Sequence, residues 1–194
     1  MKLNLGCGRF PMEGYVNVDG APAVRPDVLH DLNVFPYPFP PGSAEEVHAS
    51  HVLEHLADPF AAVAEWARLL APAGRMIVRV PHFSRGFTHP DHKRGFDVSF
   101  PLYFDPAFEG GFTGTHLVCD SLRLRWFAQP WLKKRALGPW EYRFGATFGT
   151  LVDFLAALSP FAASRLWGFF VGGFEEVEFR FHKPAAPSAP PGAA

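Results

Sequence analysis

The chain has 194 residues, the size of one domain with a substantial hydrophobic core. Its formal net charge of -1 argues against a protein that wraps nucleic acid, because phosphates require a strongly basic surface. Two cysteines, Cys7 and Cys119, are too few for a disulfide framework and favour a reducing, cytoplasmic compartment. The first residues lead directly into an apolar run and lack the layout of a signal peptide.

The first predicted strand ends at a glycine-rich turn. An apolar run at the N-terminus breaks at Gly6-Cys7-Gly8, and a second run, residues 15–20, closes with Asp19. Glycines let a ligand lie against the main chain, and a carboxylate after the next strand accepts both hydroxyls of a ribose. The pair favours a nucleoside site over the alternative, in which the glycines only form a tight turn.

Three further segments precede the first predicted helix. Residues 26–32 form a short strand that closes with Asp31, and residues 35–42 are a proline-rich loop. Residues 46–53 resume as a strand that runs into a turn. Each of the first strands therefore ends close to a polar or glycine residue, as expected at the ligand-binding edge of a parallel sheet.

The first predicted helix begins at Asp58 and Pro59, which are suited to the N-cap and the first helical position. It stops at residues 71–74, and residues 75–81 form the next strand. Strands separated by loops and a helix are typical of a parallel α/β sheet. The apolar face of the helix consists of Phe60, Val63, Ala67 and Leu70.

The second half of the chain has a different pattern. Residues 82–121 show little periodicity and are predicted to form a lid after the fifth strand. Residues 122–127 alternate as a strand, Lys133-Lys134-Arg135 is predicted to be a solvated loop, and residues 174–182 form a last, half-exposed strand. Residues 184–194 are rich in proline and alanine and are predicted to be a disordered tail after a single domain of residues 1–183.

Residues 145–174 are almost uncharged. Asp153 and Pro160 interrupt the segment, and both are costly inside a bilayer. We therefore predict two short, well-buried helices that meet at Ser159 and Pro160, rather than a membrane span. Contact with a membrane surface is the less favoured alternative.

Four motifs occur in order at a characteristic spacing: Leu3–Gly8, Val18-Asp19, His51–Leu56 and Leu69–Arg75. Together they resemble the class I S-adenosylmethionine (SAM)-dependent methyltransferases, and the small bacterial type-11 group in particular. The resemblance implies a Rossmann-like α/β sheet of about seven strands, the last of them antiparallel. It also implies SAM as the cofactor.

The resemblance assigns cofactor contacts to several positions. The glycine turn would lie against the methionine part, Asp19 would hold the ribose hydroxyls, and Asp31 would read the adenine amino group beside the Leu32 amide. The alternative for both carboxylates is that they cap the element that follows. The full set of implied cofactor-binding residues is Leu5, Gly6, Cys7, Gly8, Arg9, Asp19, Gly20, Asp31, Leu32, Ser50, His51 and Leu53.

One feature departs from the family. A helix normally follows the glycine turn and its N-terminus helps to hold the cofactor's carboxylate, but here only Arg9 to Gly14 separate the turn from the next strand. We therefore expect this helix to be shortened or missing. We also expect Arg9 to supply the lost positive charge through a bidentate pair.

The histidines suggest acid–base chemistry. His51 is the candidate catalytic residue near the methyl group, and His89 and His92 are candidate lid residues that contact the acceptor. His89, Asp91 and His92 are plausible metal ligands, but no companion motif completes a set, so no metal is predicted. His55 is more simply a partly buried polar contact, and His48 an exposed strand position.

The acceptor is not specified by a motif. Eight aromatic residues after the fifth strand form either an apolar acceptor pocket or the core of the lid: Phe83, Phe87, Phe96, Phe100, Tyr103, Phe104, Phe108 and Phe112. The motif that nucleic-acid amino-methylating enzymes carry after the fourth strand is absent, so no nucleic acid partner is expected.

The predicted function is methyl transfer from SAM to a small-molecule acceptor, at oxygen or less readily at nitrogen. Two alternatives stay open. A non-catalytic SAM- or nucleoside-binding module would keep the same motifs. A nucleotide-binding oxidoreductase would require a Gly-x-Gly-x-x-Gly turn that opens a long helix, and residues 6–14 lack both.

Overall fold

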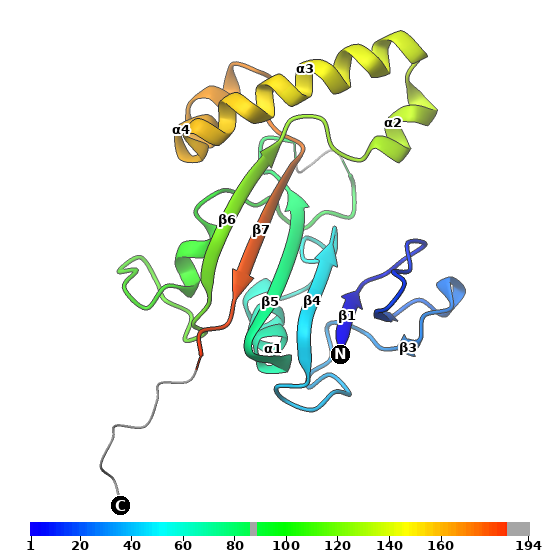
Figure 1. The fold of residues 1–194 in the computed structure, drawn as a ribbon, viewed down its shortest axis with the longest axis vertical. Coiled ribbons are helices and arrows are strands. Elements are labelled where there is room, and N and C mark those ends of the chain that lie inside the picture. Colours follow the sequence, from blue (N-terminus) through cyan, green and yellow to red (C-terminus); the bar gives the residue numbers. More distant parts are fainter. Residues whose placement is uncertain (86–88, 186–194) are drawn as a thin grey trace, which may run out of the picture.

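The computed structural model describes residues 1–85 and 89–185, and these residues form one seven-stranded sheet in the order β3-β2-β1-β4-β5-β7-β6 (Figure 1). Neighbouring strands from β3 to β5 are parallel, and β7 is antiparallel to both of its neighbours. The predicted Rossmann-like α/β fold is confirmed. The strands are β1 (Lys2–Leu5), β2 (Val16–Asp19), β3 (Val28–Leu29), β4 (Ala44–Ser50), β5 (Leu70–Pro81), β6 (Val118–Arg125) and β7 (Glu176–His182).

The first connection of the sheet is short. Residues 6–15, all of which the structure describes, join β1 to β2 without a helix, as the sequence predicts. The next connection contains only a 3₁₀ turn, η1 (Pro22–Val24). A full helix first appears as α1 (Pro59–Leu69) between β4 and β5. The Asp58 carboxylate accepts hydrogen bonds from the Phe60 and Ala61 amides at 2.9 and 3.0 Å, so the predicted N-cap is confirmed.

One face of the sheet is apolar. Along each strand every second residue points to this face, where α1 and the 3₁₀ turn η3 (Phe100–Phe104) cover it (Figure 1). The ring centroid of Phe100 lies 5.7 Å from that of Phe179, and Phe104 lies 5.8 Å from Phe181. Residues 96–104 therefore belong to the main core and not to a separate lid, because their aromatic side chains fill the space that a helix would fill.

The other face of the sheet is polar. A hydrogen-bonded row, here called the polar row, crosses it from strand to strand: Asn17, Asn4, His48, Arg79 and Glu178. The Asn4 amide donates to Asn17 at 2.9 Å, and Arg79 Nε donates to Glu178 Oε2 at 2.6 Å. His48 lies between Asn4 at 3.4 Å and Arg79 at 3.5 Å, and is buried rather than exposed as predicted.

The last strand is more central than its sequence suggests. We predict a half-exposed strand from its alternation, but β7 lies between β5 and β6 and is buried along most of its length. Its acidic residues alternate with apolar ones because Glu178 pairs with Arg79 and Arg180 on the polar face. The prediction was wrong because paired charges permit burial on both faces of a strand.

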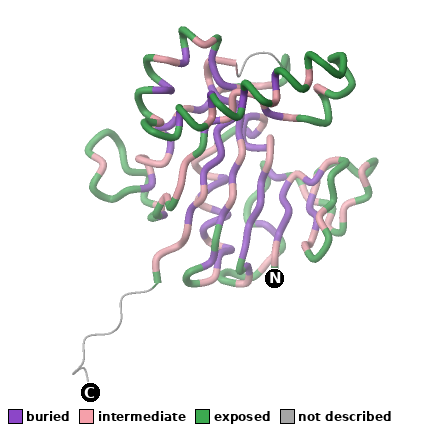
Figure 2. Tube along the Cα trace, turned by 45° about the horizontal axis from the view of Figure 1, so that its top comes forward, coloured by how far each residue is buried: buried purple, intermediate pink, exposed green. Residues whose placement is uncertain are grey.

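The helices before β7 also differ from prediction. Lys133–Arg135 lie in a helix, α2 (Pro130–Ala136), rather than in a loop. The helices α3 (Pro139–Leu158) and α4 (Pro160–Arg165) meet at Ser159 as predicted, followed by η4 (Trp167–Phe169). The predicted burial is wrong, because only Gly145, Gly149, Val152 and Ala156 of the 20 residues of α3 are buried. Its outer face is exposed (Figure 2).

Among the described residues, none of the helices has the combined length and apolar character needed to cross a membrane. The predicted tail from residue 186 onward, and residues 86–88 of the predicted lid, lie outside the described residues.

Candidate active site

The glycine turn lies at the carboxyl end of β1. The amides of Gly6 and Cys7 donate to the Val18 carbonyl at 2.8 and 3.1 Å, which ties the turn to β2. Gly6 has a φ of +64°, and a Cβ atom there would lie 2.4 Å from Val52 Cγ2. Gly8 has a φ of +50° and open space where its side chain would be. The turn therefore requires glycine and presents bare main chain to a ligand.

A cavity of about 370 Å³ lies on one side of this turn, here called the acidic cavity. Asp19 accepts hydrogen bonds from the Gly8 amide through Oδ2 and from the Ala21 amide through Oδ1, both at 2.8 Å. Each carboxylate oxygen keeps a second lone pair for a ligand. The lining residues are Gly6, Gly8, Asp19, Gly20, Asp31, Leu32, His51, Val52, His55 and Leu56.

Asp31 forms the far end of the acidic cavity. Its Oδ1 accepts from the Asn33 amide at 2.9 Å, and this bond lowers the pKa of the carboxyl below its ordinary value. Asp31 thus caps the turn that follows it and also lines the cavity. The capping and ligand-binding interpretations of Asp19 and Asp31 are compatible in this structure.

A larger cavity of about 730 Å³ lies on the other side of the turn, here called the basic cavity. Arg9, Arg79 and Arg135 line it, and Arg9 forms no ion pair with any described residue. The basic cavity opens over the polar face of the sheet, where Asn4, His48 and Arg79 of the polar row line it. Its full lining is Asn4, Gly6, Cys7, Gly8, Arg9, Phe10, Met12, His48, Ser50, His51, Arg79, Gln129, Trp131 and Arg135.

His51 lies between the two cavities and lines both. Its Nε2 is 2.9 Å from Glu176 Oε2, and its Nδ1 is 3.3 Å from Glu54 Oε1. Burial lowers the pKa of His51, but the two carboxylates outweigh it and raise the pKa to about 9. Because both ring nitrogens face carboxylates, His51 does not fit the neutral base that the sequence suggests.

His89 and His92 line neither cavity. They pack around His55, with the three ring centroids between 4.9 and 5.9 Å apart, beside the acidic cavity. His55 Nδ1 lies 3.2 Å from the Asp91 carbonyl oxygen. The fold therefore brings together His55 and His92, which the sequence assigns to different roles, next to Glu54.

Two implied cofactor contacts are not in the site. Leu5 and Leu53 are 0% exposed, belong to the hydrophobic core and line neither cavity. The Leu5 side chain lies on the same face of β1 as that of Leu3, two residues earlier, and Leu53 joins the core from the turn after β4. The other implied residues, including Cys7, Ser50 and Leu32, do line one of the cavities.

Sequence reasoning missed several lining residues. Val52 and Leu56 lie in the turn after β4, and the His51–Leu56 run was the available signal for them. Trp131 and Arg135 come from α2 and Gln129 from its N-cap, far along the chain, and no local pattern marks them.

The comparisons with known proteins agree with this geometry. A family model described as a methyltransferase domain matches residues 16–78. Methyltransferase str3 of Strobilurus tenacellus is 36% identical over 87 residues, which are 44% of this chain and 27% of that protein. The chain thus spans only about a quarter of that relative's length.

Solved structures share the fold. A SAM-dependent methyltransferase from Archaeoglobus fulgidus aligns with a TM-score of 0.55 at 16% identity, covering 94% of this chain and 85% of that chain. The YcgJ protein from Bacillus subtilis aligns with a TM-score of 0.54 at 15% identity, covering 95% and 92%.

The fold is that of the class I SAM-dependent methyltransferases. Within it, residues 16–78 match the family model of a methyltransferase domain, which agrees with the resemblance seen in the motifs. SAM is the cofactor of this class.

Proposed function

We propose that the protein is a SAM-dependent methyltransferase that acts on a small-molecule acceptor, at oxygen or less readily at nitrogen, within one domain of residues 1–183. The observation that supports this best is the glycine turn with an acidic cavity on one side and a basic cavity on the other. SAM has the complementary layout, with hydroxyl and amino donors on its adenosine and a carboxylate on its methionine. Its sulfonium supplies an activated methyl group.

The chain's own residues bind the cofactor and orient it. Asp19 and Asp31 accept hydrogen bonds from the nucleoside, while Gly6 and Gly8 allow close approach of the main chain. Arg9 pairs with the methionine carboxylate in place of the missing helix N-terminus. Since an activated methyl needs no further activation by the protein, the remaining task is to align the acceptor and exclude water.

The acceptor occupies the basic cavity. Its volume of about 730 Å³ suits a small molecule, and Trp131 offers an apolar wall beside the polar side chains of Gln129 and Arg135. His51, held between Glu54 and Glu176, acts as a positioning residue at the junction of the two cavities. The arginines favour an acceptor with an anionic group.

Calorimetric titration with SAM, S-adenosylhomocysteine and NADH tests the proposal. We expect binding of the first two and none of NADH. Asp19→Asn removes the charge but keeps the shape, and should weaken SAM binding about 10-fold or more, since a hydrogen bond to a charged group contributes about 1.5–3 kcal/mol. The matched control is Glu13→Gln, an exposed charge outside both cavities, which should bind as the wild type does.

Two results would contradict the proposal. Binding of NADH but not SAM would identify a nucleotide-binding oxidoreductase. Tight SAM binding without turnover of any acceptor in a broad screen of alcohols, phenols and amines would identify a non-catalytic binding module.

Arg9→Ala should reduce affinity for SAM more than for 5′-methylthioadenosine, which lacks the carboxylate.

A further inference from the structure

Glu54 is a buried carboxylate without a hydrogen bond. Its side chain is 0% exposed, and neither of its oxygens accepts a hydrogen bond from any described residue. An ionised carboxylate in such a place is costly unless a cation or several donors compensate it. The His51 imidazole, 3.3 Å from Oε1, is a charged neighbour of Glu54, but it also pairs with Glu176 at 2.9 Å. The residue follows β4 directly, in the turn that lines the acidic cavity, so its environment is built by the same segment as the candidate active site.

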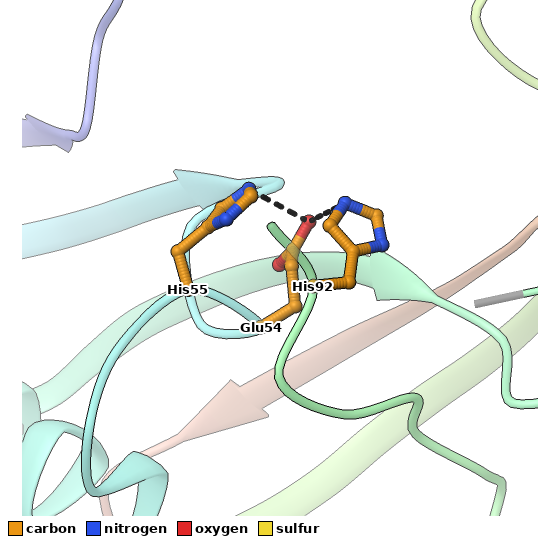
Figure 3. Close-up of side chains that lie close together, drawn as sticks. All are labelled: Glu54, His55 and His92. Atoms are coloured by element: carbon orange, nitrogen blue, oxygen red, sulfur yellow. Dashed lines mark ion pairs between the residues drawn. The ribbon is translucent and has the colours of Figure 1, made fainter. Parts of the chain in front are cut away.

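Imidazole nitrogens converge on one oxygen of this carboxylate. Glu54 Oε1 lies 3.8 Å from His92 Nε2 and 4.0 Å from His55 Nε2 (Figure 3). Ligand atoms of the three residues all lie within 4.8 Å of one another. A third nitrogen, Nδ1 of His51, is 3.3 Å from the same oxygen and also lacks a hydrogen bond within the described chain.

The tautomer of His55 supports metal binding. Its Nδ1 lies 3.2 Å from the Asp91 carbonyl, which only accepts, so Nδ1 carries the proton and donates. The lone pair of the neutral ring is then on Nε2, the nitrogen that faces Glu54. Histidine ligands of metals are commonly oriented in this way, through a hydrogen bond from the other ring nitrogen to a carbonyl.

We propose that Glu54, His55 and His92 bind a divalent transition-metal cation of the Zn²⁺ type. Two imidazoles and one carboxylate are a donor set of zinc sites that keep a coordination position open for a ligand. Bonds of about 2.0–2.1 Å would bring the ligand atoms to about 3.3 Å from one another, a small inward movement from the observed distances.

The candidate metal ligands named from the sequence form a different set. His89, Asp91 and His92 are close in the chain, but His89 and Asp91 are exposed, and Asp91 contributes its carbonyl to His55. Only His92 belongs to both sets. Residues after β4 and residues after β5 meet here because the carboxyl ends of neighbouring parallel strands share one edge of the sheet.

The cation would lie beside the proposed cofactor. His55 also lines the acidic cavity, so an open coordination position there would face the nucleoside part of the proposed cofactor. This contact with the cofactor rests on the proposed function, whereas the metal site rests on the geometry of the three side chains.

The test is metal titration of the full chain after dialysis against a chelator. We expect one equivalent of Zn²⁺ by calorimetry, and one equivalent of Co²⁺ with the visible absorption of a low-coordinate nitrogen and oxygen site. Glu54→Gln and His92→Asn should each weaken binding at least about 10-fold, while His116→Asn, an exposed histidine on a distant loop, should not.

Unchanged affinity in Glu54→Gln, or equal loss in His116→Asn, would overturn the assignment. Circular dichroism of Glu54→Gln excludes loss of the fold, and removal of a buried charge should raise its melting temperature in the absence of metal. SAM titration of the metal-free protein keeps the two proposals apart, because metal binding without SAM binding would contradict only the proposed function.

A second observation concerns the outer surface of the helices before β7. This surface, here called the apolar surface, includes Phe170 at 86% exposure and Trp140 at 79%. It runs along α3, α4 and η4 at the far end of the sheet (Figure 1). Its exposed members are Trp140, Phe144, Phe148, Leu151, Phe154, Leu155, Leu158, Phe161, Leu166, Phe169 and Phe170.

The charges around the apolar surface are mainly basic. Lys134 and Arg143 are exposed and lie over the rings of Tyr142 and Trp140, at 5.6 Å from each centroid. The acidic residues of α3 are engaged locally, since Glu141 accepts from the Gly138 amide and Asp153 from the Trp126 amide, both at 2.7 Å. Aromatic and basic side chains around an apolar helical face are typical of interfacial membrane helices.

We infer that the apolar surface binds the interface of an anionic membrane. The neighbouring helix α2 contributes Trp131 and Arg135 to the basic cavity, so binding would place that cavity near the lipid headgroups. Basic residues close to an anionic surface each contribute about 1 kcal/mol, and the apolar side chains add burial in the interface.

Sedimentation with vesicles tests this inference. The protein should bind phosphatidylcholine vesicles that contain phosphatidylglycerol at least about 10-fold more tightly than pure phosphatidylcholine. Both Phe154→Ser/Phe170→Ser and Lys134→Glu/Arg143→Glu should reduce binding, while SAM affinity, as a check of the fold, stays constant. Absence of vesicle binding would overturn the inference. So would a wild-type dimer in light scattering that Phe154→Ser/Phe170→Ser makes monomeric, because a second copy would then cover the surface.

Discussion

The two faces of the sheet have opposite chemistry although they are built by the same strands. On the apolar face, Leu5, Val78 and Phe179 are fully buried under α1 and η3. On the polar face, Asn4, His48 and Glu178 are also largely buried, but within the hydrogen-bonded polar row. Burial alone therefore does not distinguish the faces. The apolar face is buried by side chains from α1 and η3, whereas the side chains of the polar face bury one another within the hydrogen-bonded polar row.

The difference explains where the basic cavity comes from. Its floor includes Asn4, His48 and Arg79, all members of the polar row. The short connection from β1 to β2 contains no helix along residues 6–15, and the basic cavity opens over the row next to this connection. The apolar face supplies stability, and the polar face supplies ionised groups for the site.

The largest expected effect is on the apolar face. Phe179→Ala removes a ring that contacts Phe100 and Phe181 and is 0% exposed. We expect the free energy of unfolding to fall by about 3–5 kcal/mol, measured by urea denaturation. Phe170→Ala, at an 86% exposed ring, is the matched control and should change it by less than about 0.5 kcal/mol. Similar losses in both variants would contradict the division of the faces.

Much of the fold could be predicted from local signals. The glycine turn, the strand-ending carboxylates and the Asp58 cap act over a few residues, and each is observed where expected. The position of β7 could not be predicted, because alternation in a strand with paired glutamates resembles alternation in a half-exposed strand. The two cases differ in whether Glu178 has a partner, and that partner, Arg79, lies about a hundred residues earlier in the chain.

Most of the acidic cavity was predictable from the sequence, whereas in the basic cavity only the glycine turn, Arg9, Ser50 and His51 were. Asp19 and Asp31 follow consecutive strands, so their meeting at one edge follows from a parallel sheet. The convergence of His92 on Glu54 depends on the path of an irregular segment after β5. Some aromatic residues of that segment lie in the core and others line a surface hollow. Their sequence does not indicate which residues do which.

The next largest effect on the free energy of unfolding is expected from the titration of His82, a buried histidine. His82 is 0% exposed, with serine hydroxyl oxygens at 2.7 and 2.8 Å from its ring nitrogens, and burial lowers its pKa to about 4. The unfolded chain has the ordinary value of 6.5 and takes up a proton first. The contribution of His82 to the free energy of unfolding should therefore be constant above pH 6.5 and fall by about 3 kcal/mol between pH 6.5 and 4.

Unfolding of the wild type and of His82→Gln across this pH range measures the effect. The amide of the variant can still bond to both serines but does not titrate. We expect the difference between the two curves to grow as the pH falls from 6.5. A wild-type curve parallel to that of His82→Gln would show that His82 is not held neutral.

The smallest effect is expected on the polar face, at Glu178. Burial raises the pKa of this carboxyl, but Arg79 and Arg180 outweigh it and hold the pKa below its ordinary value. Glu178→Gln should lower the free energy of unfolding at pH 7 by about 1–2 kcal/mol, because both arginines are partly exposed and solvent screens the pairs. Since the folded-state pKa is lowered, the contribution of the charge is present above the ordinary glutamate pKa and is lost as the pH falls through the folded-state value. The variant and the wild type should therefore converge in acid. A gap that persisted there would mean that Glu178 acts through its packing, and the two faces would then be stabilised in the same way.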